Sequence, residues 1–145
     1  MNPSCASPMV HISYWKFFQE YYAPLLKEAD ILLKTMDDSV PASEVARVLA
    51  MKTEMVEKIM AENNIESIDR NNFLHIMMLG DSSLCQLVQR EFLCGSPEEY
   101  SPAKIAYIYG LQSQHVTSVC QKNGFTEIPA RAVPALLDKI YVYII

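Results

Sequence analysis

The sequence predicts a mainly α-helical protein made of two tandem bihelical repeats with short β pieces, plus an aromatic helix at the N-terminus. Two observations support this fold class. Apolar residues recur at helical spacing in the stretches 42–61 and 102–121. Over residues 44–68 and 104–128, aligned without a gap, four positions are identical and seven more are close in kind. Such agreement at positions that a helical core requires indicates an internal repeat.

Residues 1–10 have a Pro, Ser and Asn content that is typical of disorder. Two helices are predicted after them. Ser13 can cap a helix in YWKFFQEYY, and Pro24 suits the first turn of the next helix, LLKEADILLKTM. The first of these helices carries more aromatic rings than one face can bury in a small core. It either packs over both repeats as a clamp, with Trp15 and Phe18 innermost, or forms a surface for a dimer or a partner protein. We favour packing.

Each repeat predicts the same order of elements: helix, tight turn, helix, short extended piece and a third helix. In the first repeat IESI is the extended piece, and FLHIMML is a helix that ends at Gly80. A helix from Ser82 or Ser83 to Leu93 leads to the second repeat. There FTEI is the extended piece and PARAVPALLDKIYVYI the last helix, with Pro134 in its first turn. The terminal IYVYII either docks on the body or is completed by another subunit.

These elements divide the chain into a tail with the aromatic helix (residues 1–23), a first repeat (24–80) and a second repeat (81–145). The formal net charge of −5 argues against broad nonspecific attraction to nucleic acid. The charge is uneven, however. Residues 101–145 hold four basic and two acidic side chains, a net charge of +2.

Several classes of protein are disfavoured. The sequence shows neither a signal peptide nor a membrane span, and a cytoplasmic location with reduced thiols is the expectation. The histidines and cysteines lack the spacing of zinc ligands, and no glycine-rich turn or orienting acid accompanies them. We therefore expect no metal, no cofactor and no enzymatic activity. The residues considered for such a site are His75, His115, Cys85, Cys94 and Cys120.

The two stretches resemble the helix-turn-helix of DNA-binding proteins. The fifth residue of that motif is small, as Ala46 and Ala106 are, and the ninth is glycine or another small residue, as Ala50 and Gly110 are. The fourth, eighth, tenth, fifteenth and eighteenth residues are apolar in both copies. The β piece and helix that follow each motif resemble the small winged domains of excisionase and MerR-type regulators. Only one strand of such a wing can be identified in the sequence. The resemblance implies a transcriptional regulator or a mobile-element accessory factor that binds double-stranded DNA.

In such proteins, side chains on the second helix read base edges. No acid lies between Lys104 and Gly124, and glutamine, serine and threonine there can bond bases or phosphates. The helix from Gln112 onward would enter the major groove, while Lys104 and Lys122 would hold the backbone. The expected DNA-contacting residues are Lys104, Gln112, Ser113, Gln114, His115, Thr117, Ser118, Gln121 and Lys122.

The N-terminal copy differs at the same surface. Three carboxylates there, Glu54, Glu57 and Glu62, would face phosphates unfavourably. We expect this copy to brace the other or to meet a partner, through a secondary DNA or partner face of Lys52, Thr53 and Lys58. Because one neutral reading helix gives little affinity, a homodimer or a partner protein is implied, through the aromatic helix or IYVYII. The alternative function is a protein-interaction module that keeps the fold without binding DNA.

Overall fold

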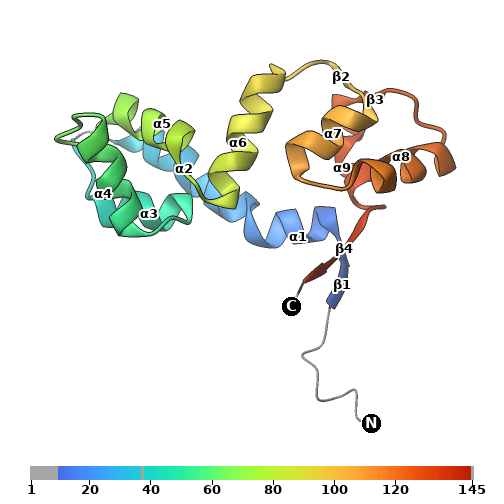
Figure 1. Ribbon diagram of the computed structural model, residues 1–145, viewed down its shortest axis with the longest axis horizontal. Coiled ribbons are helices and arrows are strands. Elements are labelled where there is room, and N and C mark those ends of the chain that lie inside the picture. Colours follow the sequence, from blue (N-terminus) through green and yellow to red (C-terminus); the bar gives the residue numbers. More distant parts are fainter. Residues whose placement is uncertain (1–9, 37, 145) are drawn as a thin grey trace, which may run out of the picture. The chain divides into compact units, whose positions relative to one another are not determined.

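The computed structural model describes residues 10–36 and 38–144 (Figure 1). It is mainly helical with two short antiparallel sheets, which confirms the predicted fold class. The predicted disordered start, apart from Val10, lies outside the described residues. Within the described part of the chain, no helix is both long enough and apolar enough to cross a bilayer.

The chain divides into two compact units. One unit is Tyr22–Ser96, and the other joins the chain up to Tyr21 with the part from Pro97 onward. This grouping differs from the division at residues 23 and 80 that the sequence suggests. The N-terminal helix joins the second repeat because Ser13 Oγ donates a hydrogen bond to Asp138 (2.8 Å) and the Tyr14 N–H donates one to the Ile140 carbonyl (2.6 Å).

The unit Tyr22–Ser96 holds the first repeat. Its elements are α2 (Ala23–Thr35), α3 (Ala42–Leu49), α4 (Thr53–Glu62), α5 (Arg70–Leu79) and α6 (Ser83–Cys94). Pro24 lies in the first turn of α2, as predicted, and a single antiparallel bridge joins Val40 to Ile68. The core of this unit is formed by buried apolar side chains, among them Val45, Leu49, Val56, Ile59, Ile68, Phe73 and Ile76.

The other unit holds the second repeat. Its helices are α1 (Tyr14–Tyr21), α7 (Pro102–Tyr109), α8 (Ser113–Lys122) and α9 (Val133–Leu137), with a 3-10 turn, η2, at Ala130–Ala132. Its strands are β1 (Val10–Ser13), β2 (Glu99–Tyr100), β3 (Ile128–Pro129) and β4 (Tyr141–Ile144). β1 pairs with β4, and β2 with β3. Buried apolar side chains of this unit include Ile105, Ile108, Val116, Ile128, Leu136, Leu137 and Ile140.

The two repeats match one another beyond the bihelical part. The bridge between Val40 and Ile68 in the first has its counterpart in the pairing of Tyr100 with Ile128 in the second. The equivalence continues, at the same offset of 60, into the third helix, where each pair is buried in its own unit. These pairs are Phe73 and Val133, Ile76 and Leu136, and Met77 and Leu137.

The C-terminal prediction needs one correction. The last helix, α9, ends at Leu137, although Pro134 does lie in its first turn as expected. The sequence IYVYI does not continue it: residues 141–144 form β4 and pair with β1 at the other end of the chain. The chain turns after α9, where the Lys139 N–H donates to the Leu136 carbonyl (2.9 Å), and residues 141–144 then pair in an extended form with β1, which satisfies backbone groups of both strands.

Packing of the aromatic helix α1 is confirmed within its own unit, but the prediction that Trp15 and Phe18 are the innermost rings is wrong. Tyr14 is buried, while Trp15 and Phe18 are half-buried and stack on each other with ring centroids 5.4 Å apart. Tyr14 and Phe18 both meet Tyr109 of α7 edge-on, at 5.6 and 6.2 Å. Ser13 caps the helix as predicted, because its hydroxyl accepts the Lys16 N–H (3.1 Å).

Candidate nucleic-acid interface

The first helix of the C-terminal motif, α7, has defined ends. At its start the Ser101 hydroxyl accepts the Lys104 N–H (3.1 Å), and Pro102 fits the first turn. At its end Gly110 adopts the left-handed conformation (φ 68°, ψ 35°), which a residue without Cβ adopts at least cost. The Leu111 N–H then donates to the Ala106 carbonyl (2.9 Å). This turn fixes the direction in which the chain enters α8.

The second helix, α8, packs against its unit with one side and exposes the other side to solvent. Val116 and Cys120 are buried, and burial raises the pKa of the Cys120 thiol. Gln114, Ser118 and Gln121, at i, i+4 and i+7, form a stripe on the side away from Val116 and Cys120. A helix held in this way presents a fixed row of polar side chains.

The predicted DNA-contacting residues all lie on this motif. Gln112 is the N-cap of α8, and Lys104 is exposed in the first turn of α7. Thr117 and Ser118 are half-buried, so their hydroxyls are less accessible than the ends of the longer exposed side chains. The remaining residues of the set are exposed: Ser113, Gln114, His115, Gln121 and Lys122.

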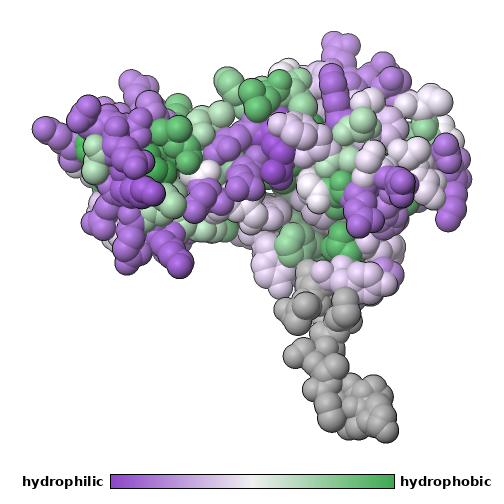
Figure 2. All heavy atoms as spheres, viewed as in Figure 1, coloured by the Kyte–Doolittle hydropathy of each residue, from purple (hydrophilic) through white to green (hydrophobic). Residues whose placement is uncertain are grey.

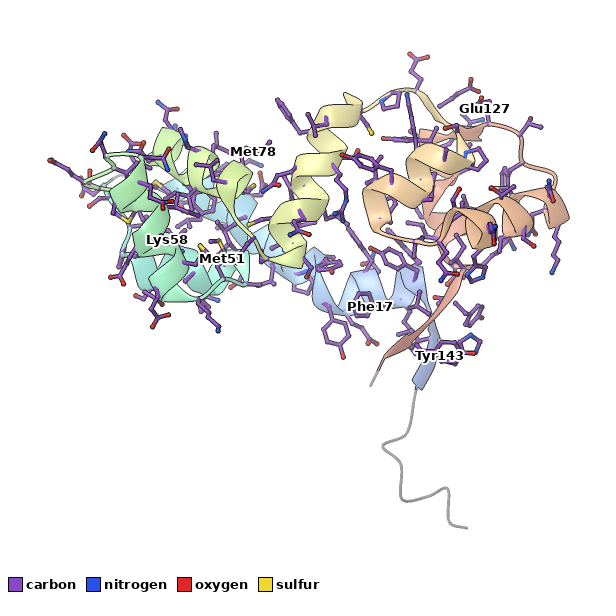
Figure 3. The ribbon with its side chains drawn as sticks, in the orientation of Figure 1. Phe17, Met51, Lys58, Met78, Glu127 and Tyr143 are labelled. Carbon is purple, nitrogen blue, oxygen red and sulfur yellow. The ribbon has the colours of Figure 1, made fainter. Side chains whose placement is uncertain are left out.

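The surface carried by α7 and α8 contains no carboxylate. The nearest acidic residues in the chain are Glu98 and Glu99 before α7, and Glu127 after α8. Glu127, labelled in Figure 3, belongs to the segment that leads to β3. The motif itself therefore adds only the positive charges of Lys104 and Lys122 to a set of neutral hydrogen-bonding groups.

The N-terminal motif has the same backbone with a different surface. Ala50 occupies the turn in the left-handed conformation (φ 57°, ψ 41°), and the Met51 N–H donates to the Ala46 carbonyl (2.8 Å). On α4, however, Glu54, Glu57 and Glu62 are exposed. Equivalent positions in the two units thus carry acids in one and neutral or basic side chains in the other.

The predicted secondary face of the first motif is hollowed. Lys52 and Lys58 are exposed and line a groove of about 520 Å³, whereas Thr53 is half-buried. Glu54 and Asp81 line the same groove, with Met51 on its wall (Met51 and Lys58 are labelled in Figure 3). Because two carboxylates stand beside the two ammonium groups, this face offers little net attraction for phosphate.

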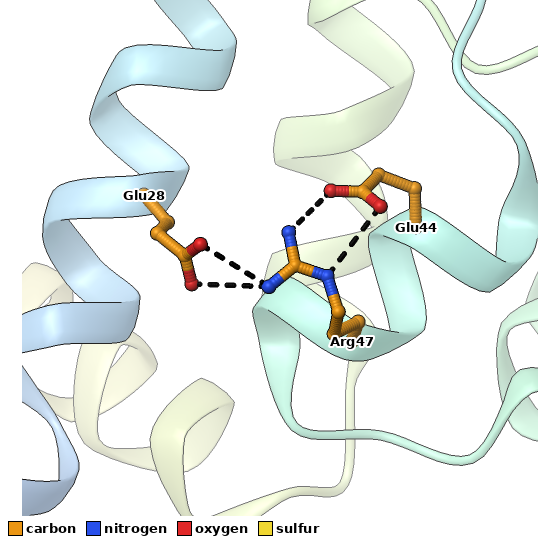
Figure 4. Close-up of polar contacts among 3 residues, drawn as sticks. All are labelled: Glu28, Glu44 and Arg47. Atoms are coloured by element: carbon orange, nitrogen blue, oxygen red, sulfur yellow. Dashed lines mark hydrogen bonds and ion pairs between the residues drawn. The ribbon is translucent and has the colours of Figure 1, made fainter.

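The arginine of the first motif is already engaged. Arg47 of α3 binds Glu28 of α2 through Nη1, at 3.1 Å from Oε1, and binds Glu44 of its own helix through Nε and Nη2 (Figure 4). The hydrogen bond from Arg47 lowers the pKa of Glu44, and the two carboxylates raise the pKa of Arg47. One guanidinium shared by two acids leaves this cluster with a net charge of −1.

An apolar groove between α5 and α6 is the feature that the sequence did not reveal. It has a volume of about 520 Å³, and its lining includes Leu74, Met78, Val88 and Phe92. Phe92 is 71% exposed, and apolar side chains gather over the C-terminal end of α6 (Figure 2). Helical spacing alone could not find the groove, because the same spacing describes a buried face.

The side chains of the types that bind metal ions do not gather in the described residues. Within them, no group of three or more His, Cys, Asp or Glu side chains could hold a metal ion. Cys85 is buried, and burial raises the pKa of its thiol. In comparisons with known proteins, no family model, no curated protein and no solved structure matches the chain.

Proposed function

We propose that this protein binds double-stranded DNA as a transcriptional regulator or mobile-element accessory factor, and that its second repeat reads the sequence. The observation that supports the proposal most is the open side of α8. It is polar, free of carboxylates and carried by a helix whose other side is anchored by Val116 and Cys120. A surface of this composition suits the floor of a major groove, where donors and acceptors must match base edges.

In the proposed mechanism α8 enters the groove by its N-terminal end. Gln112 and Gln114, both exposed there, are the candidates for bidentate bonds to adenine. Lys104 and Lys122, at the start of α7 and the end of α8, contact phosphates and set the register. The first repeat, with three exposed acids on α4, takes no part in the reading.

Fluorescence anisotropy with a duplex selected from a random-sequence pool tests the proposal. Affinity should fall steeply as NaCl rises, and each of Lys104→Ala and Lys122→Ala should reduce the slope of log K against log salt by about 0.9. The double variant Gln112→Ala, Gln114→Ala should weaken binding to the selected duplex by about 10- to 100-fold. Failure of the full chain to bind any duplex at low salt would contradict the proposal.

A matched control lies in the other repeat. Lys52 and Glu54 occupy the positions equivalent to Gln112 and Gln114. The double variant Lys52→Ala, Glu54→Ala should leave the affinity unchanged within about twofold, because that surface is not expected to touch DNA.

A second candidate function is protein interaction through the first repeat. The apolar groove between α5 and α6 favours it, since such grooves accept the apolar side of an amphipathic helix. This candidate predicts that the full chain binds no duplex at low salt, which is the opposite of the DNA proposal.

A further inference from the structure

The ribbon of β1 and β4 joins the two ends of the described chain. Its register pairs His11 with Tyr143 and Ile12 with Val142, antiparallel. Among the described residues each of these strands has one neighbour only, so the ribbon has two outer edges. A two-stranded ribbon is marginally stable unless a core or further strands support it.

The direction of the backbone groups follows from one hydrogen bond. The Tyr14 N–H donates to the Ile140 carbonyl at the end of the ribbon, so residues 14 and 140 have the orientation of a bonded pair, although the Ile140 N–H itself donates to the Leu137 carbonyl. Bonded and non-bonded pairs alternate along an antiparallel ladder. The pair Ile12 and Val142 is therefore bonded, whereas Tyr141 and Tyr143 point their N–H and C=O groups away from β1.

The two edges differ in access. On the β1 edge Ser13 is only 6% exposed and its hydroxyl is held by Asp138, which leaves His11 as the one outward-facing β1 residue that is exposed. On the β4 edge Tyr141 is 46% and Tyr143 is 62% exposed. Neither VHIS nor YVYI contains a charged residue or proline, which are the usual protection of an open edge.

The aromatic side of the ribbon is already ordered. His11 stacks on Tyr143 with ring centroids 4.7 Å apart and an interplanar angle of 14°, and it meets Tyr141 at 4.9 Å. These rings lie on one side of the ribbon, and all three residues are exposed (Tyr143 is labelled in Figure 3). A strand added at the β4 edge would extend this row of rings.

We propose that the β4 edge pairs with the β4 edge of a second copy of this chain, antiparallel about a twofold axis. An antiparallel strand is complementary to itself, which a free, uncharged edge permits and a charged edge would prevent. The register that uses both tyrosines places Val142 on the axis and Tyr141 opposite Tyr143 of the second copy. It forms about four backbone hydrogen bonds and a four-stranded sheet with adjoining tyrosine rings.

The pairing itself does not depend on DNA. Its use does rest on the proposed function: two copies would bring two α8 helices to one duplex, as paired half-sites require. Because the contact is small, the dimer should form and dissociate with concentration in the micromolar range, on the order of 1–100 μM. Sedimentation of the full chain without DNA therefore separates failure of this inference from failure of DNA binding.

Proline substitution distinguishes the outer from the inner backbone groups. Tyr143→Pro removes an N–H that points away from β1 together with the ring that stacks on His11, so it should raise the dimer dissociation constant by more than about tenfold and lower the thermal midpoint by less than Val142→Pro does. Tyr143→Phe keeps the N–H and the ring and should dimerise like the original chain. Val142→Pro removes an inner N–H and should lower the thermal midpoint more.

Amide hydrogen exchange gives a second measurement on the unaltered chain. Protection of the Tyr141 and Tyr143 amides should rise with protein concentration, whereas protection of the Val142 amide should not. A chain that stays monomeric at all concentrations up to about 500 μM, well above the range expected for a weak contact, overturns the proposal. So does a Tyr143→Pro variant that dimerises as before.

Discussion

The two repeats have the same backbone pattern and equivalent core positions but differ in their surfaces. Both turns use a left-handed residue, Ala50 in one and Gly110 in the other, and in both the next N–H donates to the carbonyl of the small fifth residue, Ala46 or Ala106. The exposed side of α4 is acidic, whereas that of α8 has no acid at all. The core positions specify the fold, and the surface positions are free to specify different functions.

The largest expected effects test whether the cores are equivalent. Ile76 and Leu136 occupy matching buried positions, so Ile76→Ala and Leu136→Ala should each cost about 2–5 kcal/mol of stability. Trp15, the one tryptophan of the chain, reports on the unit that contains Leu136. In denaturant titrations, Leu136→Ala should shift the tryptophan fluorescence transition, and Ile76→Ala should shift the helical signal by circular dichroism.

A large cost for one variant and little cost for the other would show that the two core positions are not equivalent. The conservative exchanges Ile76→Val and Leu136→Met serve as controls, and each should cost less than about 1.5 kcal/mol.

Exchange of surface charges gives the next largest effect. Gln114→Glu with Lys122→Glu places on α8 the acids that α4 carries at Glu54 and Glu62, and should weaken duplex binding at least about 100-fold through charge repulsion. Anisotropy against the selected duplex measures it, with the thermal midpoint as a check on folding.

The reverse exchange in the first repeat is the matched control. Glu54→Gln with Glu62→Lys removes two acids from α4 and should not weaken binding. A loss in this variant equal to that in the α8 variant would show that both repeats meet DNA.

The two turns should respond to exchange with opposite signs. Gly110→Ala puts a Cβ on a left-handed residue and should cost about 1 kcal/mol, while Ala50→Gly relieves the same strain and should stabilise by a similar or smaller amount. Thermal unfolding of each variant measures the difference. Destabilisation by Ala50→Gly would mean that unfolded-chain entropy outweighs the relief of strain.

The smallest effect concerns Arg47. Its hydrogen bonds lower the pKa of Glu44 from an ordinary value near 4.5. A carboxyl with a lowered pKa stabilises the folded chain above its unfolded pKa, and the contribution is lost as the pH falls through the folded value. Arg47→Met should therefore lower the thermal midpoint by a few degrees at most at pH 7, because this pair is at the surface, and the difference should disappear as the pH falls through the lowered pKa of Glu44.

The sequence predicts the helices well and the ribbon poorly, for physical reasons. The apolar spacing of α3, α4, α7 and α8 is local, and Ser13 and Pro24 mark helix starts by their own chemistry. The strands β1 and β4 are four residues long each, and the paired residues Ser13 and Tyr141 are 128 positions apart in the sequence. No turn sequence between them therefore indicates that they pair. The run IYVYI is apolar at every position and fits a helix or a strand equally.

The candidate site could be predicted in part. The helical spacing of α8 predicts correctly that its glutamines are exposed, because the apolar Val116 and Cys120 define the buried side of the helix. The half-burial of Thr117 and Ser118 and the engagement of Arg47 by Glu28 depend on contacts that residue spacing does not encode. For the same reason the burial of Tyr14, in place of Trp15 and Phe18, is set by tertiary packing against Tyr109.

The most direct measurement is an NMR titration of the full chain with the selected duplex. The backbone amides of residues 112–122 and the side-chain amides of Gln112, Gln114 and Gln121 should shift, while the amides of residues 52–62 should stay in place. Shifts confined to residues 52–62, or none in either helix at low salt, would contradict the claim that the second repeat reads DNA.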